Sequence, residues 1–153
     1  MAANGRSTSQ SISMPGTFSI MSVIAGKIGV QVGTHLLHLP EGGKGKLLGG
    51  MPSTERGRVV VFGAGKAGGA SAALAAAAGA NVTVFEMRQD RMDDMMRLGN
   101  NVTALYPYHD VVAREVAAAD LVIGAVLVTG AKAPHVMTRE MLRDMEDGSV
   151  VVD

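Results

Sequence analysis

One stretch decides the fold of this chain: Val59-Val60-Val61-Phe62-Gly63-Ala64-Gly65-Lys66-Ala67-Gly68. Its four apolar residues, three of them β-branched, predict a buried strand, and an alanine-rich run at residues 70–80 predicts a helix. Between the two lies a Gly-x-Gly-x-x-Gly turn, which in this setting is typical of pyrophosphate binding. The N–H groups at the start of the helix favour an anion there. We therefore predict that residues 63–68 bind the pyrophosphate of a dinucleotide.

A second predicted strand ends in an acidic residue. Residues 81–85 are followed by Glu86, which lies 18 residues after Gly68. A carboxylate at this place accepts hydrogen bonds from an adenosine ribose and repels a 2′-phosphate, so it favours NAD over NADP. Arg88 follows two residues later and softens that repulsion. A second interpretation stays open, a glycine-rich turn without a ligand, because a chain with 20 glycines matches such motifs easily.

Strands and helices alternate from residue 58 to the end of the chain. Five strands are predicted, at residues 59–62, 81–86, 102–105, 121–128 and 149–152. Short connections and right-handed crossovers predict an α/β fold of the Rossmann type, a doubly wound parallel sheet in the order 3-2-1-4-5. Ligands bind at the carboxyl edge of such a sheet, where the strand order reverses. That edge brings residues 63–68 close to residues 126–133.

The chain before the first strand divides into two predicted segments. Residues 1–17 are polar and are predicted to be disordered. Residues 18–57 combine a long amphipathic helix, at residues 18–39, with a glycine-rich connector. The isoleucines of the helix repeat at four-residue spacing and mark its predicted apolar face: Ile20, Ile24 and Ile28. Its glycines indicate close packing against another element: Gly26, Gly29 and Gly33. Residues 58–153 form the predicted nucleotide-binding domain, incomplete at its C-terminal end.

The composition excludes several classes of protein. The chain has 153 residues, of which 14 are basic, 14 are acidic and none is cysteine. The balanced charge argues against nucleic acid as a partner, and the lack of cysteine excludes disulfides and zinc bound by cysteine. Lys27 and Gln31 in the middle of residues 18–39 argue against a membrane span. We predict no metal site and expect a cytoplasmic protein.

Three blocks of this sequence resemble alanine dehydrogenases. They are the glycine loop at residues 42–50, the strand at residues 148–153, and the block between them that ends in Gly130-Ala131-Lys132-Ala133-Pro134. The order and spacing of the blocks match that family as well, over residues 21–153. Proton-translocating transhydrogenase subunits are similar in fold and share the weaker motifs.

The resemblance implies NAD as cofactor and the reversible oxidative deamination of L-alanine to pyruvate and ammonium. Glu86 stands where the family has an aspartate for the ribose hydroxyls, and Arg91 matches a basic position near the adenosine. Ser22 matches a serine that contacts the cofactor, while Val126 and Leu127 would line the nicotinamide side. Together with the glycine turn, these positions form the predicted cofactor-binding set: Ser22, Gly63, Ala64, Gly65, Lys66, Ala67, Gly68, Glu86, Arg91, Val126 and Leu127.

The resemblance also implies what this chain lacks. In the family, a catalytic lysine and histidine and a substrate-binding arginine lie in an N-terminal domain, and nothing before Ser22 resembles that domain. We therefore predict that this chain carries no catalytic residue and is inactive alone. L-alanine or pyruvate would be a partner only if a substrate domain is supplied. The full-length family implies a homo-oligomer. Other interpretations stay open: a non-catalytic NAD-binding module, a transhydrogenase-like NAD domain working with a separate chain, a non-binding remnant and, more weakly, a methyltransferase.

Overall fold

A computed structural model describes residues 15–126 and 137–153 of the chain. Its described residues form a five-stranded parallel sheet in the order β3-β2-β1-β4-β5. The predicted fold class and strand order are confirmed. The strands are β1 (Arg58–Phe62), β2 (Asn81–Phe85), β3 (Val102–Leu105), β4 (Leu121–Gly124) and β5 (Val150–Val152). The fourth strand is shorter than the predicted 121–128, because it ends at Gly124.

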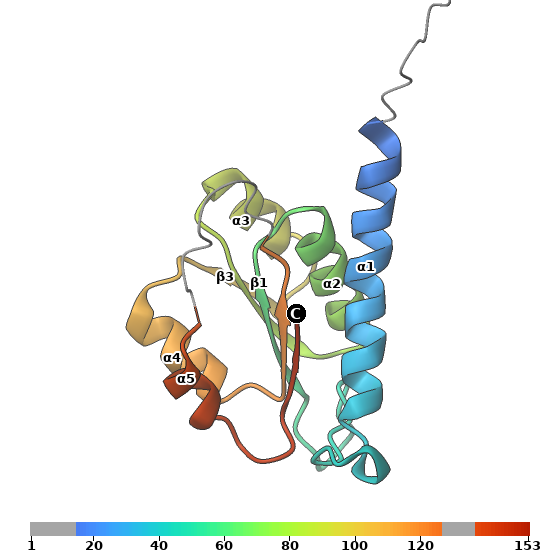
Figure 1. Cartoon of the computed structure of the whole chain (residues 1–153), viewed down its shortest axis with the longest axis vertical. Helices are drawn as coiled ribbons and strands as arrows, with labels where there is room; N and C mark the ends of the chain where they lie inside the picture. Colours follow the sequence, from blue (N-terminus) through green and yellow to red (C-terminus); the bar gives the residue numbers. More distant parts are fainter. Residues whose placement is uncertain (1–14, 127–136) are drawn as a thin grey trace, which may run out of the picture.

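Helices cover both faces of the sheet. They are α1 (Pro15–Leu36), α2 (Lys66–Ala77), α3 (Gln89–Met96), α4 (His109–Ala117) and α5 (Arg139–Arg143), with a short 3₁₀ helix, η1 (Leu39–Glu41), after α1. Figure 1 shows α1 and α2 on one side of the strands and α4 and α5 on the other. The sheet is therefore doubly wound, as predicted. In the part of the chain that the structure describes, none of the helices is long and apolar enough to cross a membrane.

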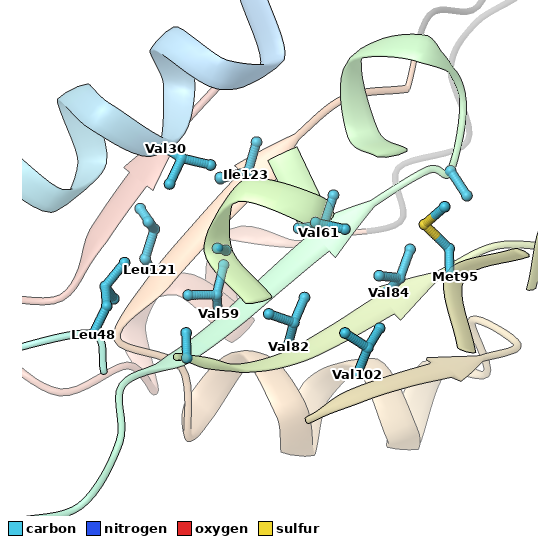
Figure 2. Packing of buried hydrophobic residues seen from close by; sticks show 14 of the residues in the cluster. Val30, Leu48, Val59, Val61, Val82, Val84, Met95, Val102, Leu121 and Ile123 are labelled. Carbon is cyan, nitrogen blue, oxygen red and sulfur yellow. The ribbon is translucent and has the colours of Figure 1, made fainter. Parts of the chain in front are cut away.

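The two faces of β1 explain why its sequence is a continuous apolar run. Val59 and Val61 point toward α1 and α2, and Figure 2 shows them packed with the valines of neighbouring strands. Val60 and Phe62 belong to a second cluster with α4 and α5. A strand of a parallel sheet that is covered on both faces needs apolar residues at every position. The strand is therefore fixed by burial on both sides, and its carboxyl end holds the glycine turn.

The prediction that the isoleucine face of α1 is its packed face is wrong, because that face is exposed. The apolar residues that repeat along it are between 37% and 62% exposed: Ile20, Met21, Ile24, Ile28, Val32 and Leu36. The buried side carries Val30, Leu37 just beyond the helix, and the three glycines. The helix also begins at Pro15, inside the segment predicted to be disordered, whose residues 1–14 lie outside the described part. It ends at Leu36, three residues before the predicted end at residue 39.

Close approach of backbones decides which side of α1 faces the protein. A Cβ atom at Gly26 would collide with the carbonyl oxygen of Ala67, in the first turn of α2. At Gly33 it would collide with the side chain of Leu121 on β4. The Ser71 hydroxyl of α2 donates a hydrogen bond to the Gly26 carbonyl, at 2.8 Å. The glycines therefore let α1 lie directly on α2 and on the sheet, as their positions predicted.

Candidate dinucleotide-binding site

The turn between β1 and α2 is locked at two of its glycines. Gly63 has a φ of 87°, a conformation that favours glycine, and its N–H donates to the Phe85 carbonyl at 2.8 Å. A Cβ atom at Gly68 would overlap the carbonyl oxygen of Gly63. Glycine at both positions therefore lets α2 begin directly against the end of β1.

Gly65, the middle glycine of the motif, has open space beside it in the described part of the chain. Among the described residues, no atom outside its chain neighbours lies within 4 Å of the position that a Cβ atom of Gly65 would take. Gly65 is the N-cap residue of α2, and the first helical hydrogen bond runs from the Gly69 N–H to the Gly65 carbonyl, so the N–H groups of residues 66–68 have no partner within the helix. This combination of an open approach and unpaired donors fits the pyrophosphate of a dinucleotide.

Glu86 holds the turn from the neighbouring strand. The residue is 9% exposed, and its Oε2 atom accepts the N–H of Ala64 at 2.9 Å. Its Oε1 atom accepts the N–H groups of Met87 and Arg88, at 2.8 and 3.1 Å. One carboxylate therefore joins the end of β2 to the turn after β1.

The same carboxylate keeps capacity for a ligand. A carboxylate offers about four lone-pair sites. Two on Oε1 and one on Oε2 are used by backbone N–H groups, which leaves a site on Oε2 for a ribose hydroxyl. Burial raises the pKa of Glu86, but the hydrogen bonds from Ala64, Arg88 and Met87 and the charge of Arg91 outweigh it and hold the pKa below its ordinary value. The carboxyl is therefore ionised at neutral pH, which makes it a stronger acceptor for hydroxyl groups.

Two arginines lie beside this carboxylate. The Arg91 Nη1 atom lies 3.6 Å from Glu86 Oε2, and the side chain of Arg91 is 42% exposed. Arg88 forms a two-point ion pair with Asp90, in which Nε and Nη2 donate to the two carboxylate oxygens at 3.1 and 2.7 Å. The predicted residues Glu86 and Arg91 are thus brought together, and the pairing of Arg88 adds a feature that the sequence did not predict.

Two further predicted residues, Val126 and Ser22, lie on other elements of the described chain. The Val126 side chain lies beside Gly63, where a Cβ atom would be 3.3 Å from its Cγ2. Ser22 is half-buried on α1, one turn before the glycine that packs on Ala67, so it lies on the side of the helix that faces α2. Leu127 lies outside the described residues, as does most of the loop 126–133 that was expected at this edge. A role in cofactor binding stays a prediction for the whole set.

A second ion network, missed from the sequence, lies at the opposite edge of the sheet. Lys44 Nζ lies 2.7 Å from Asp120 Oδ1 and 2.8 Å from Glu146 Oε2. The Arg58 N–H, at the start of β1, donates to Asp120 Oδ2 at 2.7 Å. These residues lie far apart in the chain, so no local spacing marks them. The glycine loop around Lys44 is therefore anchored at the amino ends of the strands, away from the turn.

The fold, together with the glycine turn at the carboxyl edge of the sheet, defines a Rossmann-type domain of the class that binds dinucleotides. Within that class, the chain belongs to the family whose model is described as the alanine dehydrogenase/PNT C-terminal domain, which matches residues 29–153. The resemblance to alanine dehydrogenases is thus confirmed. Membership of this family implies a nicotinamide cofactor.

Individual relatives agree with the family model. An alanine dehydrogenase from Geobacillus stearothermophilus is 45% identical over 134 residues, which are 87% of this chain and 36% of the relative. A solved L-alanine dehydrogenase structure has a TM-score of 0.83 and 39% identity, over 88% of this chain and 37% of that one. A transhydrogenase from Sinorhizobium meliloti has a TM-score of 0.74 and 29% identity, over 88% of this chain and 38% of that one. The chain thus spans little more than a third of the length of these relatives.

Proposed function

We propose that this chain binds NAD at the carboxyl edge of β1 and β2, as the cofactor domain of an alanine dehydrogenase-like oxidoreductase. The observation that carries the proposal is the contrast within the glycine turn. Gly63 and Gly68 are required by the protein's own backbone, whereas the Cβ position of Gly65 faces open space. Packing alone would accept a larger residue at Gly65, so an approaching ligand is the reason to keep glycine there.

The residues around the turn have distinct roles in this proposal. Residues 63–68 hold the pyrophosphate through the N–H groups at the start of α2. Glu86 accepts a ribose hydroxyl at the site left on Oε2, and Arg91 lies on the adenosine side. Val126, with Leu127 and Ser22, belongs to the nicotinamide side, as the family resemblance implies. We assign residues 58–153 to the NAD-binding domain and residues 18–57 to its helix and connector.

NAD is proposed in preference to NADP because of the charge at Glu86. Its pKa is held below the ordinary value, so the carboxylate is negative at neutral pH and repels a 2′-phosphate. The same charge attracts the 2′-hydroxyl as a hydrogen-bond donor.

The reaction proposed for the longer protein is the oxidation of L-alanine by NAD and water to pyruvate, ammonium and NADH. The bound nicotinamide supplies the hydride acceptor. The structure describes three histidines: His35 and His38 are exposed near the far end of α1, and His109 is exposed at the start of α4, which follows the outermost strand, β3. At a rise of about 1.5 Å per residue, His35 is about 14 Å along the helix from Gly26, which packs on the turn. We therefore propose that this chain supplies the cofactor half of the site and that the acid–base residues come from elsewhere.

A second candidate function rests on the similarity to the Sinorhizobium meliloti transhydrogenase. In that case the chain is an NAD-binding module that works with a separate chain and oxidises no alanine itself. Both candidates need the same turn and the same Glu86, so nucleotide binding supports either of them. An assay with an added substrate domain distinguishes the two candidates. Formation of NADH from L-alanine supports the first candidate and excludes the second.

Calorimetric titration of the 153-residue chain with NAD tests the proposal. Gly65→Val fills the open approach to the turn and should abolish the binding heat while the fold remains. Gly16→Val is the matched control, because a Cβ atom there also meets nothing within 4 Å, at the start of α1. Equal binding by Gly65→Val and the parent chain, or no binding by the folded parent chain, would refute the proposed site.

A further inference from the structure

Asp90 pairs with Arg88, a residue that lies close to the position that distinguishes NAD from NADP. Arg88 follows Glu86 by two residues, and its backbone N–H donates to Glu86 Oε1. The hydrogen bonds and charge of Asp90, and more weakly the charge of Glu86, raise the pKa of Arg88. The Arg88 side chain therefore starts from the place where the adenosine ribose binds in folds of this class. An arginine near this acidic position is the group that accommodates a 2′-phosphate in NADP-binding domains.

In this structure Arg88 is already engaged. Both oxygens of Asp90 accept hydrogen bonds from its guanidinium, at 3.1 and 2.7 Å. The same contact lowers the pKa of Asp90, so the pair is charged at neutral pH. The neighbouring Arg91 faces the carboxylate of Glu86 at 3.6 Å. Each of the two guanidinium groups beside the ribose position thus has its own carboxylate partner.

We propose that Asp90 is a specificity-determining residue, which acts by holding Arg88 and so withholding its guanidinium from the 2′-phosphate of NADP. The inference rests on the proposed binding site. Asp90 disfavours NADP in two ways, because it competes with the phosphate for Arg88 and repels the phosphate directly. The Arg88 and Asp90 side chains are 59% and 65% exposed, and exposed ion pairs are weak, so the effect is modest. A change of about fivefold in relative affinity is the expected size.

The test is a pair of titrations, of the parent chain and of Asp90→Asn, with NADH and with NADPH at low ionic strength, followed by nicotinamide fluorescence. The measured quantity is the ratio of the two dissociation constants. Asp90→Asn should shift that ratio toward NADPH by about fivefold, and added salt should shrink the shift. A purely structural role of Asp90 would change both constants together and leave the ratio as it was.

Two further variants assign the shift to Arg88. Asp94→Asn is the matched control, because Asp94 lies on the same helix and pairs with Arg97 at 2.9 Å, so it makes the same change in net charge. It should move the ratio less than twofold. Arg88→Gln combined with Asp90→Asn should remove the gain for NADPH.

The outcomes separate this inference from the proposed function. Equal shifts in Asp90→Asn and Asp94→Asn, or a gain that survives Arg88→Gln, would overturn the role of Asp90 while leaving the site in place. An unchanged ratio with normal NADH binding would do the same. No binding of either nucleotide by the folded parent chain would overturn the proposed function, and the specificity role with it.

Discussion

At each of the two edges of the sheet, a buried carboxylate accepts a backbone N–H group next to β1, but the two carboxylates have different roles. At the amino edge, Asp120 accepts the N–H that begins β1 and pairs with Lys44 at 2.7 Å. At the carboxyl edge, Glu86 accepts the N–H of Ala64 just after β1, but its cation, Arg91, stays 3.6 Å away. Asp120 is 5% exposed and is in direct contact with Lys44 of the glycine loop. Glu86 lies beside a turn that is open at Gly65.

The difference teaches how one strand can be fixed at both ends and still leave room for a ligand. A buried carboxylate that contacts a cation directly contributes to the fold alone. A carboxylate whose cation is farther away, and whose position is fixed by backbone donors, can accept a further hydrogen bond from a ligand. If this account is right, damage at the amino edge changes stability only, and damage at the carboxyl edge changes stability and nucleotide affinity together.

Asp120→Ala should have the largest effect on stability. It leaves the Arg58 N–H and the buried side of Lys44 without their acceptor, and breaking a buried ion pair costs about 3 kcal/mol or more. Urea denaturation of the parent chain and the variant gives the difference in unfolding free energy, with the exposed Asp147→Ala as control. Nucleotide affinity of the folded variant should stay at the parent value. A loss of affinity without a loss of stability would reverse the assignment of the two edges.

Glu86→Gln should cost less stability but should also weaken binding. A glutamine has one carbonyl oxygen, so it cannot accept from both Ala64 and the turn of Met87 and Arg88. The N–H left unpaired lowers the unfolding free energy by about 2 kcal/mol. NADH affinity should fall at least about tenfold, since a hydrogen bond to a charged acceptor is lost together with the order of the turn. Unchanged affinity in a destabilised variant would mean that Glu86 is structural only.

The amino edge, unlike the carboxyl edge, should also lose stabilisation in alkali. The folded pKa of Glu86 lies below its reference value of 4.5, so its stabilisation is complete above that value and is lost as the pH falls through the folded pKa. Burial lowers the pKa of Lys44, but its bonds to Asp120 and Glu146 outweigh it and raise the pKa above 10.5. Its stabilisation is therefore present below pH 10.5 and is lost as the pH rises through the folded pKa.

Unfolding free energy measured against pH tests this pair of responses. The difference between the parent chain and Glu86→Gln should shrink in acid, and the difference between the parent chain and Lys44→Met should shrink in alkali. Differences that stay flat at both ends would contradict the assigned pairings.

Glu146→Gln should have the smallest effect of the series. Its side chain is 77% exposed, so its contact with Lys44 is screened by water, whereas the contact of Lys44 with Asp120 is not. The loss of stability should be a small fraction of that of Asp120→Ala in the same urea experiment. A loss as large as that of Asp120→Ala would show that Glu146, rather than Asp120, carries the amino edge.

Local sequence predicted the geometry of the glycine turn at the carboxyl edge because that geometry is set by nearby residues. Gly63 and Gly68 are set by a turn of six residues, and the place of Glu86 follows from the length of one strand–helix–strand unit. The choice of residues 63–68 therefore needed no knowledge of distant contacts. By contrast, Lys44 and Asp120 lie 76 residues apart in the chain (120 − 44), and no pattern in the sequence predicts that ion pair.

The side of α1 that packs against the rest of the protein could not be predicted, because two sequence patterns on the helix indicate opposite sides. Isoleucines at four-residue spacing, such as Ile24 and Ile28, form one stripe, and the glycines form another on the opposite side. Burial of apolar area favours the first, and close backbone approach requires the second. The approach of Gly26 to Ala67 decides the outcome, and only the position of α2 reveals it.

Amide chemical shifts during a titration with NAD test the central claim most directly, because they report on both edges in one experiment. The shifts should concentrate at Ala64, Gly65 and Lys66 and at the residues after Glu86, while the amides of Lys44, Leu121 and Gly148 stay where they were. Shifts centred on the amino edge, or a well-folded chain with no shifts at saturating NAD, would contradict it.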